Sequence, residues 1–389
     1  MRTAAATILA LFLAACSGSS AGGQPTASSP AASPASIASA SSTNLGPFAV
    51  LVHRAGGAEP YAIQLVRPDG RALPAVHALS RSLKTYYPLS SPCPSGRCAN
   101  SSTANYQLPE TSVSASRVYF LDGEADLNAL SPSGNVTRIR HLDGEANSNL
   151  AFAVSPDDRR IAVAIITYTP AGSASAFGLR LYAEDLLGGG HRTAVFTSNS
   201  IVEWPIGWRG GNVVLAIGHP GVLTGFNPYG AVQYQLVDPA TWTSQAVLTC
   251  SYGPLVAAGS ACWNPAGLGR QDWTGNTINF RLDPAAAVSR LQPAYLALSP
   301  DGRRVAGGVK AATAGAYDTE LFEDGSESLL VPGAAPLGWL DATQLLVLAP
   351  TGPAIAAVPG GALTPVTGLT PLPNQGWPSL LGILPAALG

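Results

Sequence analysis

The sequence of 389 residues has little charge, since Asp, Glu, Lys and Arg together make up 11% of it. A typical soluble domain has about a quarter of such residues, so long helices held by surface salt bridges are not expected. The 21 basic residues are scattered and the formal net charge is -2, which leaves no basic patch of the kind that binds nucleic acid. The composition therefore excludes nucleic acid as the main partner.

The apolar run at the start of the sequence is too short to cross a bilayer. It covers residues 3–15 behind Met1 and Arg2, whereas a membrane-spanning helix needs about 20 residues. A short apolar run behind a positive start is typical of an export signal. This one ends in Leu-Ala-Ala-Cys at Cys16, an ending that resembles the signal of bacterial lipoproteins.

The resemblance implies that residues 1–15 are removed and that Cys16 carries acyl chains such as palmitate. These chains would anchor the protein to the cell membrane or cell envelope, on the extracytoplasmic side. An ordinary export signal followed by an incidental cysteine is the alternative. From Cys16 to residue 45 the chain is nearly all Ser, Ala, Gly, Pro and Thr without a charge, so we expect a disordered tether.

The four other cysteines fall into two pairs that are close in sequence, Cys93 with Cys98 and Cys250 with Cys262. In an exported protein this pattern predicts two disulfides, each closing a short loop. Loops of this size contribute roughly 2 to 3 kcal/mol each. Zinc is the alternative, but Cys93 and Cys98 have no second pair of Cys or His nearby.

A short motif recurs along the rest of the chain. Residues 154–162 read VSPDDRRIA and residues 298–306 read LSPDGRRVA, each between two apolar segments. In three related segments the dipeptide Gly-Trp stands in place of Ser-Pro, with its tryptophan at Trp208, Trp339 and Trp377. Pro followed by Asp or Gly forms tight turns between antiparallel strands. Further turns of this kind, such as Arg-Pro-Asp-Gly at 67–70, follow each motif and give units of four strands.

Four strands every 40 to 50 residues predict an all-β fold, a β-propeller of four-stranded antiparallel blades over residues 46–389. We place seven units, with six or eight as alternatives, near residues 46–79, 112–142, 148–197, 201–249, 262–292, 293–332 and 334–369. The first unit lacks an innermost strand, and the C-terminal segment 375–384 reads as one more strand. We expect this C-terminal strand to close the ring in the first blade.

The Ser-Pro-Asp-Gly-Arg-Arg-Val-Ala element at 299–306 resembles the WD-like repeat of TolB-type β-propellers. That resemblance implies protein partners in the cell envelope. TolB-type proteins also carry a separate N-terminal α/β domain, which this sequence does not show, so their particular partners are not transferred to this chain.

The two faces of the expected propeller differ in their loops. The four strands of a blade, A to D from the channel outward, run alternately up and down, so the B–C loops and the connections between blades lie on one face. We name it the long-loop face, because it includes the segments 80–112, 167–178, 218–231 and 249–274. Elaborated loops on a rigid scaffold are where binding usually occurs, although they can also be tolerated insertions. Aromatic residues of these segments are candidates for contact with a protein or a glycan, with core packing as the alternative: Tyr86, Tyr87, Tyr106, Tyr168, Phe226, Tyr229, Tyr252, Trp263 and Trp273. Trp208, Trp339 and Trp377 are expected to pack between blades.

We expect a small acidic duplication on the same face. Asp122, Glu124 and Asp126 alternate as oxygen ligands do in calcium loops, but Asp-Gly is also common in hairpin turns. Solvated turns are the favoured interpretation, with calcium as the alternative. No other cofactor is expected.

Few residues of the chain suggest catalysis. The five histidines are spread without metal-ligand spacing and are expected to be solvated at strand ends: His53, His77, His141, His191 and His219. We therefore predict a noncatalytic, monomeric propeller that binds a protein or glycan of the cell envelope. The alternative is an envelope enzyme, of hydrolase or lyase type, with its site in the central channel. Acidic residues and histidines at a channel mouth would favour the enzyme, and a channel lined by Ala, Val and Gly would favour the binder.

Overall fold

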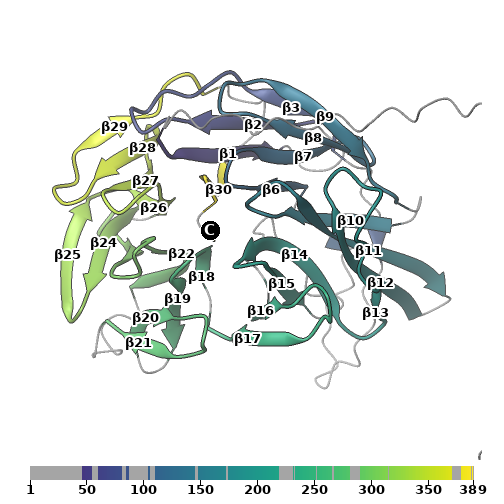
Figure 1. The fold of residues 1–389 in the computed structure, drawn as a ribbon. Coiled ribbons are helices and arrows are strands. Elements are labelled where there is room, and N and C mark those ends of the chain that lie inside the picture. The colour runs from purple at the N-terminus through teal and green to yellow at the C-terminus, as the bar shows by residue number, and fades with distance from the viewer. Residues whose placement is uncertain are drawn as a thin grey trace, which may run out of the picture. The chain divides into compact units, whose positions relative to one another are not determined.

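The computed structural model describes residues 46–54, 60–80, 85–86, 104–105, 110–144, 148–171, 174–218, 231, 233–250, 252–264, 267–280, 290–313, 315–369, 378–386 and 388. Their strands form seven four-stranded antiparallel sheets arranged in a ring, and one two-stranded sheet (Figure 1). The described residues include no helix of the length and hydropathy that a membrane crossing requires. The prediction of a seven-bladed, all-β propeller is confirmed.

Each blade contributes its innermost strand to the channel wall and three further strands toward the rim. In blade 1 the order from the channel is β30 (Ser379–Leu384), β1 (Phe48–Arg54), β2 (Tyr61–Val66) and β3 (Val76–Ala78). Blade 2 has β6 (Thr111–Val113), β7 (Val118–Asp122), β8 (Asp126–Leu130) and β9 (Val136–His141). Blade 3 has β10 (Ser148–Val154), β11 (Arg160–Ala171), β12 (Ala174–Asp185) and β13 (Phe196–Ser198). Blade 4 has β14 (Val202–Arg209), β15 (Asn212–Gly218), β16 (Gln233–Val237) and β17 (Ser244–Leu248).

The remaining blades follow the same order. Blade 5 has β18 (Tyr252–Val256), β19 (Gly259–Asn264), β20 (Gly267–Gln271) and β21 (Thr277–Asn279). Blade 6 has β22 (Leu291–Leu298), β23 (Val305–Lys310), β24 (Tyr317–Glu323) and β25 (Ser326–Val331). Blade 7 has β26 (Ala335–Trp339), β27 (Gln344–Ala349), β28 (Gly352–Ala357) and β29 (Leu363–Pro365). The two-stranded sheet consists of β4 (Thr85–Tyr86) and β5 (Ala104–Asn105).

Two predicted segments differ from the structure. The unit at 262–292 is misplaced, because β18, β19 and β20 of blade 5 occupy most of the segment 249–274 that we expected to be a loop. Gly and Pro at positions 253 and 254 weaken the strand pattern there, although an innermost strand tolerates both. The segment 167–178 is also no loop for most of its length, because β11 and β12 extend through it as one long hairpin.

The C-terminal strand closes the ring as predicted. β30 pairs antiparallel with β1 and occupies the innermost position of blade 1. Leu384 is 2% exposed and packs with residues of blades 1 and 2, while Ile383 packs in the apolar cluster between blades 1 and 7. The first and last strands of the domain are therefore parts of one sheet.

The repeated motif forms the turn between the two innermost strands of blades 3 and 6. Ser155 Oγ donates a hydrogen bond of 2.6 Å to Asp157, and it accepts one of 2.9 Å from the backbone N–H of Arg160. Ser299 makes the corresponding bonds, of 2.6 and 3.0 Å, in blade 6. The Ser and Asp side chains thus satisfy the polar groups of a tight turn, which explains why the motif recurs.

The second arginine of each motif contacts the tryptophan of the next blade. Arg160 lies 5.4 Å from the ring centre of Trp208, and the indole of Trp208 donates a 2.9 Å hydrogen bond to the carbonyl of Ala153. Arg304 and Trp339 repeat this contact between blades 6 and 7. The prediction that Trp208 and Trp339 pack between blades is confirmed, whereas Trp377 lies outside the described residues.

Candidate functional site

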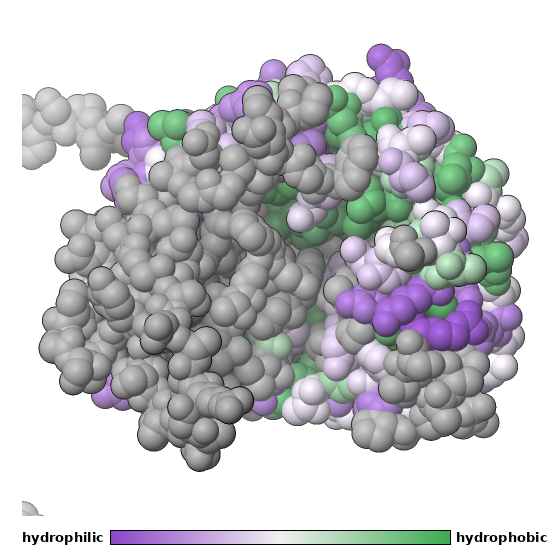
Figure 2. All heavy atoms as spheres, turned by 180° about the vertical axis from the view of Figure 1, so that it is seen from behind, coloured by the Kyte–Doolittle hydropathy of each residue, from purple (hydrophilic) through white to green (hydrophobic). Residues whose placement is uncertain are grey.

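The long-loop face consists of the B–C loops within the blades and of the connections that lead from one blade to the innermost strand of the next. Among the described residues, the face shown in Figure 2 mixes hydrophobic and hydrophilic side chains, and the most hydrophilic ones gather in a cluster at the right of the view. Large exposed hydrophobic side chains of the described chain include Leu79 on blade 1 and Leu329 on blade 6. A candidate site must therefore be sought in particular groups of side chains.

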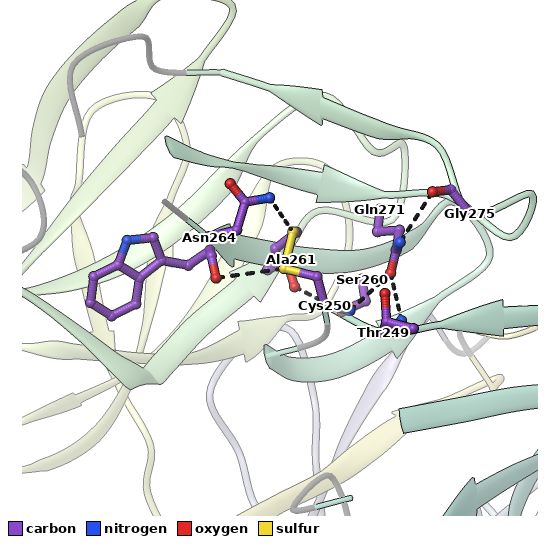
Figure 3. The surroundings of a disulfide bond; sticks show 9 residues. Thr249, Cys250, Ser260, Ala261, Asn264, Gln271 and Gly275 are labelled. Carbon is purple, nitrogen blue, oxygen red and sulfur yellow. Dashed lines mark hydrogen bonds between the residues drawn. A yellow bond between two sulfur atoms is a disulfide. The ribbon is translucent and has the colours of Figure 1, made fainter. Parts of the chain in front are cut away.

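A disulfide fixes the start of blade 5 on this face. Cys250, in the connection between β17 and β18, is bonded to Cys262 of β19, as predicted (Figure 3). Gln271 of β20 holds the same connection, because its side-chain oxygen accepts hydrogen bonds from the backbone N–H groups of Thr249 and Cys250, at 2.9 and 3.0 Å. Its side-chain nitrogen donates to the carbonyl of Gly275. The other predicted pair, Cys93 and Cys98, lies outside the described residues.

Two of the predicted aromatic candidates form a pair beside this disulfide. The rings of Tyr252 and Trp263 are tilted by 54°, with their centres 6.4 Å apart. Both side chains are half-buried and pack against the apolar cluster between blades 5 and 6. The disulfide and Gln271 therefore hold a partly exposed aromatic pair at the long-loop end of blade 5.

A second aromatic pair lies on blade 6, and its two residues are not among the predicted candidates. Tyr295 of β22 and Tyr317 of β24 meet edge to face with ring centres 4.8 Å apart, and both are half-buried. Tyr295 sits where the pairing of β22 with β23 shifts register. A Cβ on Gly308 would lie 2.6 Å from the Cβ of Tyr295, so only glycine fits beneath it. The glycine pair at 307–308 inside an apolar strand was the signal that could have indicated this close approach.

Trp273 was predicted to be a surface candidate, and this prediction is wrong. The residue is 7% exposed and packs in the apolar cluster that extends from blade 3 to blade 5. Its indole donates a 3.1 Å hydrogen bond to Val256, and Arg209 lies 5.5 Å from its ring centre. Trp273 therefore packs against an arginine as Trp208 does, although it lies in a different turn and is not part of a Gly-Trp motif.

The other predicted candidates are only partly covered by the described residues. Tyr86 and Tyr168 lie in β4 and β11, where the backbone is described. The remaining candidates lie outside the described residues, as does the predicted lipidation site: Tyr87, Tyr106, Phe226, Tyr229 and Cys16.

The acidic residues of blade 2 form a hairpin with local partners. Asp122 and Asp126 face each other across β7 and β8, and Asp122 accepts a 2.8 Å hydrogen bond from the backbone of Leu79. His141 and Arg138 contact Asp126 at 2.7 and 2.9 Å, and these hydrogen bonds lower the pKa of Asp126. Within the described part of the chain no group of three or more metal-ligating side chains comes together, here or elsewhere.

The central channel is filled mainly by apolar side chains. The innermost strands line a partly open cavity of about 80 Å³, whose described lining includes Val154, Ile206, Leu298 and Leu381, with Thr111 and Ser112 among its few polar members. A cavity of that size holds a few water molecules, whereas ligand pockets usually measure about 300 to 1,000 Å³. Figure 1 shows β30, the last strand of the described chain, at the inner side of the ring.

The glycines of the two described Gly-Trp motifs admit the C-terminal segment to the channel. A Cβ on Gly207 would lie 2.5 Å from a methyl group of Leu388, and one on Gly338 would lie 2.3 Å from a methyl group of Leu380. Each motif therefore combines a glycine that faces the C-terminal segment with a tryptophan that packs between blades.

His53 was expected to be solvated, and this prediction is wrong. The side chain is 4% exposed in β1, and its Nε2 atom is buried without a hydrogen-bond partner among the described residues. Burial lowers the pKa of His53, while a hydrogen bond with Gln64 opposes that effect. The sequence pattern did not show this, because the histidine follows an apolar run as a strand-end residue would.

We expect His53 to make stability depend on pH. Because the pKa of His53 is lower in the folded state than in the unfolded state, protons bind preferentially to the unfolded chain, and stability falls as the pH drops below about 6.5. The loss is about 1.4 kcal/mol for each unit of pKa depression. Urea unfolding of the wild type and of His53→Gln between pH 7.5 and 5 measures the difference. His77→Gln, at an exposed position, should retain most of the wild-type slope. Equal slopes for the wild type and His53→Gln would contradict the prediction.

The comparisons with known proteins concern the architecture. No family model matches the chain, and no curated protein matches its sequence. The fold is similar to TolB from Acinetobacter baumannii, with 11% identity and a TM-score of 0.28 over 86% of this chain and 65% of TolB. It is also similar to an oligogalacturonate lyase from Vibrio parahaemolyticus, with 12% identity and a TM-score of 0.42 over 80% of this chain and 92% of the lyase.

A third similar structure is the acylaminoacyl peptidase of Pyrococcus horikoshii, with 10% identity and a TM-score of 0.42. The match covers 81% of this chain and 51% of the peptidase. This chain thus spans less than two thirds of TolB and about half of the peptidase. Two of the three proteins are enzymes by name, and similarities this distant indicate no activity for this chain.

Proposed function

We propose that this protein is a noncatalytic propeller that binds a protein or glycan of the cell envelope through its long-loop face, with Cys16 as its lipid anchor. The observation that carries the proposal is the pair of half-buried aromatic contacts, Tyr252 with Trp263 and Tyr295 with Tyr317, at the long-loop ends of neighbouring blades. Partly exposed Tyr and Trp side chains on a rigid frame are the type that contributes most to protein interfaces.

The filling of the channel supports binding over catalysis. A channel enzyme needs titratable groups that converge on a cavity large enough for its substrate. The lining described here is mainly apolar, and segments of the chain itself, including Leu380 and Leu388, occupy the interior. The alternative of an envelope enzyme would need a site elsewhere on the ring.

Crosslinking in intact cells, followed by recovery of the partner, tests the proposal. Trp263→Ala and Tyr317→Ala are expected to reduce the yield of the crosslinked complex at least tenfold, because they remove aromatic contacts at the long-loop face. Trp242→Ala is the matched control, since Trp242 is a half-buried tryptophan in the turn between β16 and β17, on the opposite face. A loss of the complex in Trp242→Ala, with full yield in the other two variants, would contradict the proposal.

A further inference from the structure

Two buried polar side chains lie near the beginnings of neighbouring innermost strands. Asn149 is the second residue of β10 in blade 3, and Glu203 is the second residue of β14 in blade 4. These strands are neighbours around the channel (Figure 1), and both begin at the long-loop face. Asn149 is 8% exposed and Glu203 is 9% exposed. Neither residue lines the apolar cavity of the channel.

The strand register places both side chains in the interface between blades 3 and 4. Asn149 alternates with Ala151 and Ala153, which pack in the cluster that contains Trp208 of blade 4. On β14, Glu203 shares a side with Trp208, because their partners on β15 are four positions apart. The indole of Trp208 reaches the carbonyl of Ala153. Asn149 precedes Ala153 by four residues on β10. Glu203 precedes Trp208 by five residues on β14, one of which is the bulge residue. Asn149 and Glu203 therefore lie at the same level of the two strands.

Both side chains lack the partners that buried polar groups normally have. Among the described residues, the Nδ2 atom of Asn149 is buried without a hydrogen-bond partner. No hydrogen bond or charged group of the described residues acts on the pKa of Glu203, which burial alone shifts. Other buried glutamates in this propeller are paired. Glu184 contacts Arg140 and lies 2.6 Å from Arg192, and the carboxylate of Glu320 lies 2.8 Å from Arg290. Burial raises the pKa of Glu203, so its ionised form lowers stability at neutral pH.

The two free groups define the chemistry of what would satisfy them. The amide nitrogen of Asn149 can only donate a hydrogen bond, and an ionised carboxylate can only accept one. A hydroxyl group can do both, since it accepts from the amide and donates to the carboxylate. An ammonium group has no acceptor and would leave Asn149 unpaired. A residue that lowers stability without a partner in the fold is also the kind of residue that functional sites retain.

We propose that Asn149 and Glu203 form a binding site for a hydroxyl-bearing ligand of the carbohydrate class, at the long-loop end of the interface between blades 3 and 4. The inference rests on the proposed function and deepens it, because it selects a glycan over a protein as the ligand. The site is separate from the aromatic pairs on blades 5 and 6, so variants can test the two independently.

The test uses the full chain, an array of bacterial cell-wall oligosaccharides, and calorimetric titration with the oligosaccharide that binds best. The wild type is expected to bind, while Glu203→Gln and Asn149→Ala weaken binding at least tenfold. Glu323→Gln, the same chemical change at an exposed position of blade 6, should bind like the wild type. Glu203→Gln should also raise the melting temperature at pH 7 and lose most of that advantage near pH 4, which shows that the variant is folded.

Three results would overturn the inference. If oligosaccharides bind equally to the wild type, Glu203→Gln and Asn149→Ala, the site is wrong while glycan binding by the protein stands. If no oligosaccharide binds but a lysine-containing peptide binds in a Glu203-dependent way, the ligand class is wrong. If neither binds and a crystal structure shows a water molecule bridging the two side chains, the groups are satisfied by buried water only. The crosslinking test of the long-loop face is unaffected by any of these results.

Discussion

A chain that ends at Leu369 is expected to fail to fold, because it lacks the innermost strand of blade 1. Without β30, the inner edge of β1 loses its backbone partners from Phe48 to Val52. The buried side chains of Ile383 and Leu384 would also be missing from the clusters on both sides of blade 1. Each such side chain contributes about 1.5 to 3 kcal/mol, and whole domains are stable by only about 5 to 15 kcal/mol. Solubility on expression and the cooperativity of thermal unfolding measure the effect.

The matched control for this truncation is a chain that lacks only residues 388 and 389. It keeps all of β30 and loses the methyl groups of Leu388 beside Gly207, so we expect a folded protein with a lower melting temperature. A soluble, cooperatively unfolding chain that ends at Leu369 would show that ring closure by β30 is dispensable.

Replacing Trp208 by alanine is expected to destabilise the propeller by about 3 to 5 kcal/mol, the usual result of truncating a buried tryptophan. The side chain is 2% exposed, fills the interface between blades 3 and 4, and lies against Arg160. Trp208→Phe retains most of the apolar contact but leaves the carbonyl of Ala153 without its donor, so a loss of about 1 to 3 kcal/mol is expected. Guanidinium chloride unfolding curves measure both values.

Trp339 offers an internal repeat of the experiment, because it makes the same contacts with Arg304 and Ala297 between blades 6 and 7. Trp242→Ala is the control, since this half-buried tryptophan also joins blades 3 and 4, through a hydrogen bond from its indole to the carbonyl of Ala194, but is not part of a Gly-Trp motif. If Trp208→Ala and Trp339→Ala cost no more than Trp242→Ala, the indoles do not hold the blades together as we infer.

Turn chemistry made the architecture predictable from the sequence. The Ser-Pro-Asp motif, with hydrogen bonds from Ser155 and Ser299, has a local cause and leaves a local pattern. The closing strand was predictable as well, because an unpaired strand pattern at the end matched a missing strand at the start. Blade 5 was harder to place, since Gly253 and Pro254 weaken the pattern of β18 and since the strand is stabilised mainly by its neighbours.

The candidate site was less predictable than the fold. Burial of Trp273 and His53 depends on how two blades meet, which no local pattern records. The pair of Tyr295 and Tyr317 depends on a register shift in β22. That the described residues leave the amide nitrogen of Asn149 without a partner, and that they bury Glu203, can be recognised only when both strands and the residues around them are in place. Apart from the glycine pair at 307–308 beneath Tyr295, the sequence carried no local signal for these contacts.

The pairing of β30 with β1 also has a consequence for the order of folding. Contacts inside each blade join segments that are close in sequence, so single blades can form early. The sheet of blade 1 joins residue 48 to residue 384, and it can be completed only after the whole domain is present in one compartment. Until then β1 presents an open edge to the solvent, where β30 of a second copy could pair in place of the chain's own strand. A swapped dimer formed during slow refolding is therefore the characteristic failure expected of this propeller, and size-exclusion chromatography of refolded material at increasing concentration would reveal it.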